Sequence, residues 1–374
     1  MRTRAAILRQ SPGTFEIVEV DLEDPRQGEL QVRMVAAGLC HSDDHYQTGD
    51  TTASFYPMIC GHEGAGVVEA VGPNTSGWEV GDHVLFSYIP WCGRCRFCTK
   101  GMTNLCDLGA TLLRGSRFDD VDSFRNRLPD GTEVGQMCGI GTFAEHTTVS
   151  VQSAIKLAKD LPLTTMCLLG CGVGTGWGSA VYSADVEPGD VVIVMGTGGV
   201  GINAVQGAKH AGATTLIAVD PVEFKRTTAL SLGATHAYAT MEEADAHAKS
   251  ITNGQGADKV IITVAVLDGS HIAQAVAAIR KAGIVVLTSV TPFSYEGGIP
   301  VHPFELTMMQ KRIQGTLFGQ CSPGVDIPKQ IEMYRAGQLK LDEIVTRTYP
   351  FEELVQAYKD LNAGLNMRGV VVFS

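Results

Sequence analysis

The strongest constraint on the fold is a glycine-rich turn that lies between a strand pattern and a helix pattern. The run Gly196-Thr197-Gly198-Gly199-Val200-Gly201 contains G-x-G-x-x-G and follows the apolar segment 190–195. A helical pattern covers 199–211, and a second apolar strand pattern at 215–219 ends at Asp220. This order of strand, glycine turn, helix, strand and acidic residue is the context that a dinucleotide-binding fold requires.

Each residue type in this turn has a physical reason. Gly196 permits the tight turn, Gly198 lets the backbone approach a pyrophosphate, and Gly201 allows close packing of helix on strand. The helix N-terminus offers free N–H groups and a partial positive charge to phosphates. Asp220 can accept hydrogen bonds from a ribose diol and would repel a 2′-phosphate, so we predict NAD rather than NADP. A glycine turn in an unrelated α/β sheet is the weaker alternative in this context.

The flanking segments extend this pattern in both directions. Strand-like runs at 259–264 and 284–288 enclose an alanine-rich helical segment at 272–281, which predicts a doubly wound parallel sheet. The earlier part of the chain has short alternating runs separated by glycine-rich turns, which predicts a mostly-β region with strands at 14–20, 29–35, 64–72 and 82–86. We expect a long loop at 107–140 and, near the C-terminus, one helix at 330–336.

Size and charge exclude several classes of function. A chain of 374 residues has room for two or three domains. Its net charge of −11 argues against binding nucleic acid. The uncharged segment 161–184 has the length of a membrane span, but its proline and five glycines predict a buried, tightly turning connection. The N-terminus becomes charged too early for a signal peptide, so we expect a protein of the reducing cytoplasm.

Four of the ten cysteines form a compact set with metal-ligand spacing: Cys92, Cys95, Cys98 and Cys106. In a reducing compartment such a set is more typical of metal binding than of disulfides. Four thiolates close a tetrahedron around zinc and leave no open position, so this site is predicted to be structural. The surrounding lobe, 90–109, has little apolar content, and the metal would supply the order that a core does not.

A second metal site is predicted from residues that are far apart in the sequence. Cys40 and His62 offer a thiolate and an imidazole, which suit zinc but are weak evidence as a pair. A third ligand is available from Cys171 or, on spacing grounds, from Cys167. We favour Cys171 because it lies in a glycine-rich turn, where the backbone can approach the site. The site would then lie at the seam before the nucleotide-binding region.

These motifs together resemble the zinc-containing, medium-chain alcohol dehydrogenases over nearly the whole chain. The resemblance rests on 38–43, Gly61-His62-Glu63, the four-cysteine lobe, 171–176, the glycine fingerprint and Arg368. The family implies a GroES-like catalytic domain built from 1–172 and 318–374, with a Rossmann NAD-binding domain, 173–317, inserted between them. It also implies a homodimer or homotetramer joined through the nucleotide-binding sheets, and 312–317 resembles the joining edge strand.

The resemblance also implies a role for individual residues. Cys40, His62 and Cys171 would hold the catalytic zinc, Ser42 would hydrogen-bond the alcohol oxygen, and His45 would end a proton relay that runs through the cofactor ribose. Asp43 would orient His62, and Glu63 would lie behind the zinc. The remaining roles are contacts to cofactor or substrate: His41 and Arg368 at the pyrophosphate, Thr197, Gly199 and Val200 in the glycine turn, Asp220 and Lys225 at the adenosine ribose, Thr175 near the nicotinamide, and Tyr88 in the substrate pocket.

Two features of the sequence bear on the branch of the family. Many alcohol dehydrogenases carry arginine where this chain has His41, so its contact with phosphate is expected to be weaker and dependent on pH. The combination of 40–45, the run 172–178 with Trp177, and 317–321 resembles a bacterial nicotinoprotein branch. Enzymes of that branch keep NAD bound through turnover and pass electrons to an external acceptor.

Two other functions compete with this interpretation. Glutathione-dependent formaldehyde dehydrogenase is a sister class, which usually has tyrosine where this chain has His45. A non-catalytic NAD-binding protein, such as the crystallins of this superfamily, would have lost its zinc ligands, whereas this chain has all seven candidates. We therefore predict an enzyme that transfers hydride reversibly between a small alcohol and NAD, with two zinc ions per chain and no membrane or nucleic-acid partner.

Overall fold

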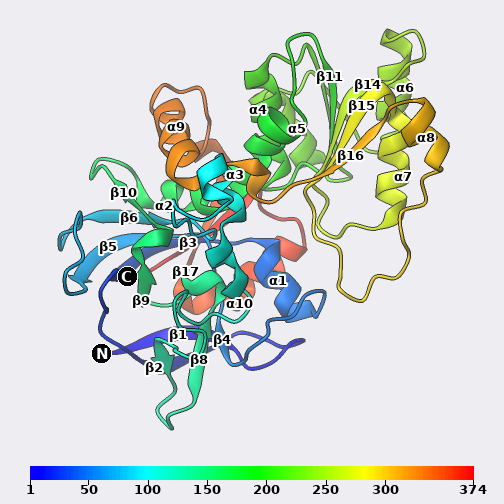
Figure 1. Cartoon of the computed structure of the whole chain (residues 1–374). Coiled ribbons are helices and arrows are strands. Elements are labelled where there is room, and N and C mark those ends of the chain that lie inside the picture. The colour runs from blue at the N-terminus through cyan, green and yellow to red at the C-terminus, as the bar shows by residue number, and fades with distance from the viewer. The chain divides into compact units, whose positions relative to one another are not determined.

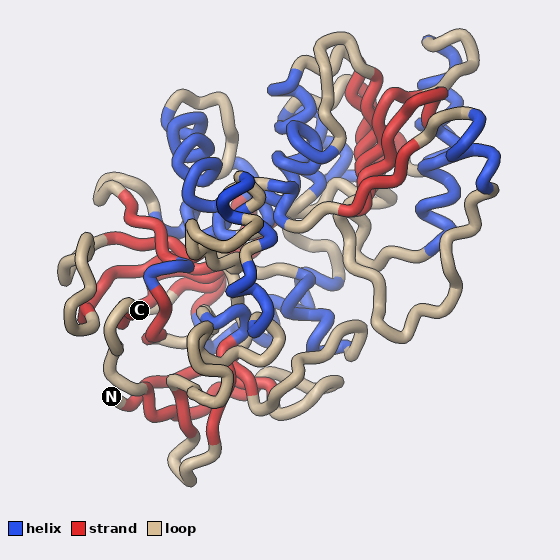
Figure 2. The backbone as a smooth tube through the Cα atoms, viewed as in Figure 1, coloured by secondary structure: helices blue, strands red, loops and turns tan.

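The computed structural model describes residues 1–374, which divide into two compact units. The first unit contains Met1–Cys171, Ser322–Glu332 and Leu341–Ser374, and the second contains Gly172–Cys321 and Met333–Lys340. The first unit is therefore built from both ends of the chain, and both termini belong to it (Figure 2).

The first unit is dominated by β-structure. A closed barrel has the strand order β1-β2-β7-β8-β4, and a seven-stranded sheet has the order β10-β6-β5-β3-β18-β17, with β9 paired to β3. The strands are β1 (Arg2–Leu8), β2 (Glu16–Leu22), β3 (Glu29–Gly38), β4 (Met58–Ile59), β5 (Gly64–Val71), β6 (His83–Phe86), β7 (Asn126–Arg127), β8 (Glu133–Gln136), β9 (His146–Ser150), β10 (Ala154–Leu157), β17 (Val345–Pro350) and β18 (Arg368–Val372).

Few helices accompany these strands. α1 (His41–Thr48) follows β3 directly, and α10 (Leu354–Asn362) packs near it through two side-chain hydrogen bonds. The others are the one-turn helix α2 (Leu163–Met166) and α9 (Pro323–Arg335), which extends into Met333–Lys340 of the second unit. α9 is longer than the helix predicted at 330–336, since Pro323 and Pro328 are both accommodated within it. The expectation of a single helix near the C-terminus was wrong, because α10 is a second one.

The second unit is a doubly wound sheet. All six strands are parallel, in the order β13-β12-β11-β14-β15-β16, which is the order of a dinucleotide-binding fold. α4 and α5 cover one face of the sheet, and α6 and α7 cover the other (Figure 1). The strands are β11 (Val191–Met195), β12 (Thr215–Val219), β13 (His236–Tyr238), β14 (Ala257–Ile262), β15 (Ile279–Leu287) and β16 (Arg312–Gly315); the helices are α3 (Gly172–Gly178), α4 (Gly201–Ala211), α5 (Glu223–Leu232), α6 (Met241–Ile251), α7 (Gly269–Ala278) and α8 (Pro303–Met308).

The segment 107–140 was expected to be a loop but contains two short strands, β7 and β8. These strands are only two and four residues long and mostly polar, so they lack the apolar alternation that signals an ordinary strand. The same segment holds two buried guanidinium groups. Arg117 and Arg125 are each 2% exposed, and their Nε atoms donate to the same oxygen of Glu29 at 3.0 and 2.8 Å. Burial of charge is tolerated here because both guanidinium groups are paired.

The uncharged segment 161–184 is a buried connection, as predicted. It runs through α2, a short 3-10 turn, α3 and a π-helical turn at Ser179–Ser183, and most of its side chains are shielded from solvent. None of the helices in the chain combines the length and the apolar character that crossing a bilayer requires.

Candidate active site and metal centres

The first ligand candidate lies where a strand passes into a helix. β3 ends at Gly38, and Cys40 is the N-cap residue of α1. A Cβ atom on Gly38 would collide with the side chains of Glu63 and Arg368, so only glycine allows the strand to approach them. The backbone carbonyl of Cys40 accepts a hydrogen bond from the Tyr358 hydroxyl at 3.4 Å, which ties this turn to α10.

The second candidate, His62, is held by a neighbouring carboxylate. Oδ1 of Asp43 accepts the Gly61 N–H at 2.7 Å, and Oδ2 lies 3.1 Å from Nδ1 of His62. Both side chains are almost completely buried. A carboxylate at the Nδ1 side of a ligating imidazole fixes the ring and leaves Nε2 for a metal. The contact is compatible with the orienting role that the family resemblance implies for Asp43, and that role stays a prediction.

Ligand atoms from distant segments converge beside this imidazole. The thiols of Cys40 and Cys171, the ring of His62 and the carboxylate of Glu63 each place one ligand atom within 4.8 Å of the others. Nε2 of His62 is buried and has no hydrogen-bond partner in the protein. A buried nitrogen without a partner, next to two thiols, fits zinc, whose ligand sets combine sulfur and nitrogen.

The rival ligand does not join this group. Sγ of Cys167 lies 3.3 Å from the backbone oxygen of Thr164, to which its S–H donates, and burial raises the pKa of that thiol. Cys171 follows a turn that ends at Gly170, where a Cβ atom would collide with the carbonyl oxygen of Phe86. The glycine therefore lets the chain approach β6 closely, and Cys171 lies at the site.

The electrostatics of the group favour a cation. A hydrogen bond from Cys171, together with the positive charge of the nearby His62, lowers the pKa of Cys40. The hydrogen bond between the two thiols, together with burial, raises the pKa of Cys171. Burial opposes the positive charge on His62, but Asp43, Cys171 and Cys40 together raise its pKa above the ordinary value. The cluster therefore holds negative charge that a divalent cation would neutralise, since metals bind the deprotonated forms of these ligands.

Glu63 and Arg368 form a buried ion pair on one side of this group. Nη2 of Arg368 donates to Oε2 of Glu63, and the two residues are 3% and 0% exposed. Burial opposes the charge on Arg368, but Glu63 and Cys40 raise its pKa. The sequence suggested a pyrophosphate contact for Arg368; the structure shows its pairing with Glu63, and Nε remains buried without a partner.

Three further predicted residues surround the group at different distances. Oγ of Ser42 lies 3.6 Å from Sγ of Cys40, and the Tyr88 ring lies edge-on to the His62 ring with centroids 5.8 Å apart. The recorded contact of His45 is with another residue, because its Nδ1 lies 3.1 Å from Oδ2 of Asp50. The sequence reasoning missed Asp50. Its only signal was an acidic residue immediately after the glycine that ends α1.

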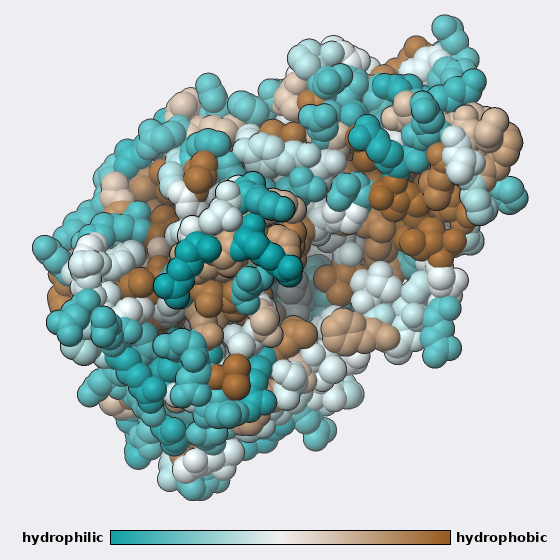
Figure 3. Space-filling model, in the orientation of Figure 1, coloured by the Kyte–Doolittle hydropathy of each residue, from teal (hydrophilic) through white to brown (hydrophobic).

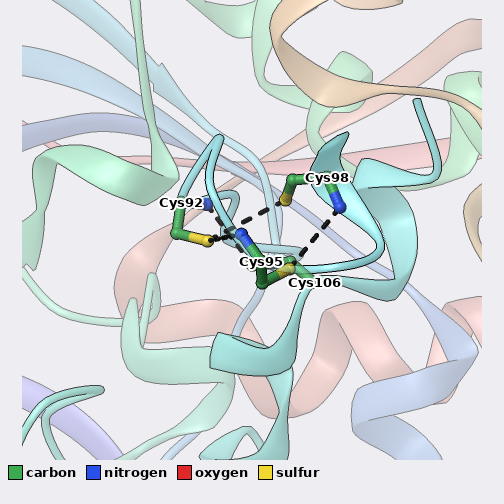
Figure 4. A group of neighbouring side chains, drawn as sticks. All are labelled: Cys92, Cys95, Cys98 and Cys106. Carbon is green, nitrogen blue, oxygen red and sulfur yellow. Dashed lines mark hydrogen bonds between the residues drawn. The ribbon is translucent and has the colours of Figure 1, made fainter. Parts of the chain in front are cut away.

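The four cysteines of the lobe face one another as predicted, and their ligand atoms lie within 4.8 Å (Figure 4). Backbone N–H groups point at the sulfur atoms; the N–H groups of Cys95 and Cys92 donate to Cys92 and Cys106, each at 3.3 Å. Backbone hydrogen bonds from Asp107 and Cys98 lower the pKa of Cys95 to about 6, whereas burial raises that of Cys106 to about 12. Sulfur atoms surrounded by N–H donors are suited to a closed four-thiolate zinc site.

The glycine turn of the second unit is shaped as the fingerprint predicts. Gly196 has φ +89° and Gly201 packs against its carbonyl, so neither position has room for a side chain. A Cβ atom on Gly198 would meet no atom within 4 Å, which leaves this face open to a ligand. The carboxylate of Asp220 accepts the N–H groups of Thr197 and Val222, both at 2.9 Å, which fixes it at the end of β12.

The other residues assigned to the cofactor lie on helices. His41 is the first residue of α1 in the first unit, and Lys225 is half-buried on α5 of the second. Thr175 is buried on α3, and its carbonyl oxygen accepts a hydrogen bond from Ser179 at 2.6 Å. These positions leave the cofactor roles of the three residues as predictions.

Comparison with known families matches both units. Residues 26–159 match the alcohol dehydrogenase GroES-like domain, and residues 199–334 match the zinc-binding dehydrogenase family. The chain belongs to the zinc-containing medium-chain alcohol dehydrogenases. Its fold is accordingly a GroES-like domain with a Rossmann domain.

Individual relatives cover the whole chain. An NDMA-dependent alcohol dehydrogenase of Amycolatopsis methanolica is 47% identical over 100% of both chains. A class-3 alcohol dehydrogenase of Cereibacter sphaeroides is 34% identical over 100% of both. Among solved structures, benzyl alcohol dehydrogenase of Acinetobacter calcoaceticus has a TM-score of 0.88 at 28% identity over 100% of both chains. A zinc-binding alcohol dehydrogenase domain protein of Burkholderia ambifaria has a TM-score of 0.91 at 31% identity, covering 100% of this chain and 99% of its own.

The two neighbouring cysteines provide a matched test of the ligand set. We expect Cys171→Ser to lose one zinc of two per chain, because a hydroxyl is a poor substitute for a thiolate on zinc. Cys167→Ser changes a buried thiol of the same segment and should keep both ions. Metal analysis of the two purified variants measures this. Two zinc ions in Cys171→Ser, or a loss confined to Cys167→Ser, would reverse the assignment.

Proposed function

We propose that this enzyme oxidises a small alcohol to an aldehyde or ketone, reversibly, with NAD as hydride acceptor and a zinc ion held by Cys40, His62 and Cys171. The single observation that carries the proposal is the convergence of these ligand atoms, with a buried imidazole nitrogen that has no protein partner. The family to which the chain belongs performs zinc-assisted chemistry of this class. We assign 1–172 and 318–374 to the catalytic domain and 173–317 to the NAD-binding domain.

Zinc in this site would supply Lewis acidity that makes the alcohol hydroxyl more acidic, and NAD would accept the hydride from the carbinol carbon. The protein has to remove the hydroxyl proton. Ser42 lies beside Cys40, where its hydroxyl can hydrogen-bond the alcohol oxygen, and His45 lies three residues further on α1. Residues three apart share one helix face, so the two are suited to consecutive places in a proton relay.

The buried charges around the ligands hold this arrangement in place. Asp43 orients His62 through its contact with Nδ1. Glu63 is neutralised by Arg368, so the region behind the ligands carries no net unpaired charge. Tyr88 presents the edge of its ring to His62 and is assigned to the wall of the substrate pocket. His41, Thr175, Lys225 and the glycine turn 196–201 are assigned to NAD, together with Asp220, whose carboxylate selects against a 2′-phosphate.

The competing functions are less well supported. The class-3 and S-(hydroxymethyl)glutathione dehydrogenase relatives are 34% and 32% identical, compared with 47% for the NDMA-dependent alcohol dehydrogenase. A non-catalytic NAD-binding protein would have no need for a preserved ligand set, and here both candidate sets are gathered in space. The alcohol dehydrogenase function therefore fits the chain better than either.

The role of Ser42 is tested by Ser42→Ala. We expect kcat for benzyl alcohol to fall about a hundredfold or more, the size of a general acid–base contribution. Zinc content should stay at two per chain because Ser42 is not a ligand. Steady-state kinetics and metal analysis on the same preparation measure both quantities. Unchanged kcat would remove Ser42 from the relay.

We further propose that NAD stays bound through turnover and that the electrons leave to an external acceptor. The support is the relative named for NDMA dependence, at 47% identity over the whole chain, together with the run 172–178 and its Trp177. The physical requirement is that reoxidation takes place on the enzyme, so the acceptor has to reach the reduced nicotinamide.

This behaviour predicts activity without added cofactor. The protein purified without NAD should oxidise benzyl alcohol when NDMA is the acceptor, and denaturation should release about one NAD per chain. Adding free NAD without NDMA should give little steady-state turnover, because the bound cofactor does not exchange. A preparation that contains no NAD and requires it in solution would contradict the proposal and leave the alcohol dehydrogenase function intact.

We also propose that the chain self-associates through the edge strand β16. β15 pairs with one side of this strand and nothing pairs with the other. Exposed apolar side chains precede it, including Phe293, Ile299, Phe304 and Met308, and Figure 3 shows hydrophobic surface gathered on this unit. An unpaired edge beside an apolar patch is a pairing surface for a second copy.

Sedimentation measures this association directly. The wild-type chain should sediment as a dimer or a larger oligomer, and Phe304→Glu with Met308→Glu should shift the mass toward the monomer. Both substitutions are on α8, away from the ligand sets, so zinc content should not change. A monomeric wild-type chain would rule out the proposal.

We infer the reducing cytoplasm as the compartment of this enzyme. All ten cysteines are free, and six of them are assigned to zinc. Free thiols and thiolate-bound zinc both persist under reducing conditions.

A further inference from the structure

The imidazole of His45 has one recorded side-chain partner, and that partner is a carboxylate. Its Nδ1 lies 3.1 Å from Oδ2 of Asp50. His45 is 4% exposed, whereas the Asp50 side chain is 29% exposed. The imidazole is therefore largely shielded from bulk water, and Asp50 is the more exposed member of the pair.

The turn after α1 fixes Asp50 in this position. Gly49 ends the helix in the left-handed conformation, with φ 88°, and the N–H groups of Gly49 and Thr51 both donate to the His45 carbonyl at 3.1 Å. The Thr48 hydroxyl donates to the same oxygen of Asp50 at 2.7 Å. The backbone and side chain of residues 45–51 thus form one closed arrangement around the imidazole.

The chemistry of the pair determines which imidazole nitrogen carries hydrogen and which can accept a proton. Hydrogen bonds from Thr48 and His45 hold the pKa of Asp50 below its ordinary value, so the carboxylate is ionised near neutral pH and can only accept. A carboxylate that accepts from Nδ1 keeps the proton on that nitrogen and leaves Nε2 as the acceptor.

The other charged groups near His45 are already engaged. Oδ1 of Asp44 accepts hydrogen bonds from Gln47 and Asn362, at 3.2 and 3.1 Å. Asp43 is occupied by Gly61 and His62. Asp50 is therefore the only charged side chain recorded in contact with the imidazole.

We propose that Asp50 is a positioning residue for proton removal: it holds His45 in the tautomer that carries hydrogen on Nδ1 and stabilises the imidazolium formed when Nε2 accepts the alcohol proton. The inference rests on the proposed alcohol dehydrogenase function and deepens it. One proton enters the imidazole at Nε2, the Nδ1–H to Asp50 hydrogen bond persists, and one proton then leaves the imidazolium for bulk water. The carboxylate stays ionised throughout.

Asp50→Asn tests this role, with Asp24→Asn as the matched control. Asp24 is an exposed carboxylate of the same unit with no recorded side-chain hydrogen bond. An amide can donate to Nδ1 and so favours the wrong tautomer. We expect kcat/KM for benzyl alcohol, with bound NAD and NDMA, to fall about tenfold or more in Asp50→Asn. The control should match the wild type.

The tautomer of His45 distinguishes this role from a merely structural one. Zinc content should be unchanged in Asp50→Asn. Nitrogen-15 spectra of the imidazoles should place hydrogen on Nδ1 of His45 in the wild type and on Nε2 in the variant.

The outcomes separate the two proposals. A wild-type protein that oxidises no alcohol overturns the proposed function. An active wild type with an unchanged rate in Asp50→Asn overturns the role of Asp50 alone, as does hydrogen on Nε2 of His45 in the wild type. In a His45→Gln background, Asp50→Asn should have no further effect on kcat/KM, and a full additional loss would show that Asp50 acts independently of His45.

Discussion

The structure depends on bringing two thiols and one imidazole together in a buried space without a protein partner for the imidazole nitrogen. A different structural feature positions each ligand. Cys40 caps a helix, His62 is held by Asp43, and Cys171 follows a glycine turn that touches β6. Removing these groups from water would be costly if they remained unpaired, so the arrangement is stable only when a cation compensates the charge that the thiolates acquire.

The charged side chains that surround the metal ligands are paired within the protein. Arg368 neutralises Glu63, and Asp43 contacts His62, so each buried carboxylate near the site has a partner. The C-terminal helix α10 adds a mechanical constraint, because Tyr358 donates to the carbonyl of Cys40 and Asn362 donates to Asp44. The first and last parts of the chain thus fix the same helix α1, whose one face carries Ser42 and His45.

The elements with a local signal were predictable from the sequence. The glycine turn, the parallel strands after it and the four-cysteine set follow from residue spacing, because a tight turn or a closed metal site demands particular residue types at short intervals. The set of Cys40, His62 and Cys171 is spread over the sequence and was assigned with the help of the family resemblance. The strands β7 and β8 were missed because they are two and four residues long and mostly polar, so they show no apolar alternation. The pairing of Arg368 with Glu63 and the contact of His45 with Asp50 depend on tertiary placement or turn geometry, which spacing does not encode.

The central claim is that the chain holds two zinc ions in chemically different sites. X-ray absorption at the zinc edge tests it most directly, because sulfur and lighter ligands scatter differently. A closed four-thiolate site and a site with Cys40, Cys171 and His62 predict, averaged per zinc, about three sulfur ligands and about one nitrogen or oxygen ligand. A spectrum that requires four sulfur ligands per zinc, with only one zinc per chain, would contradict the account.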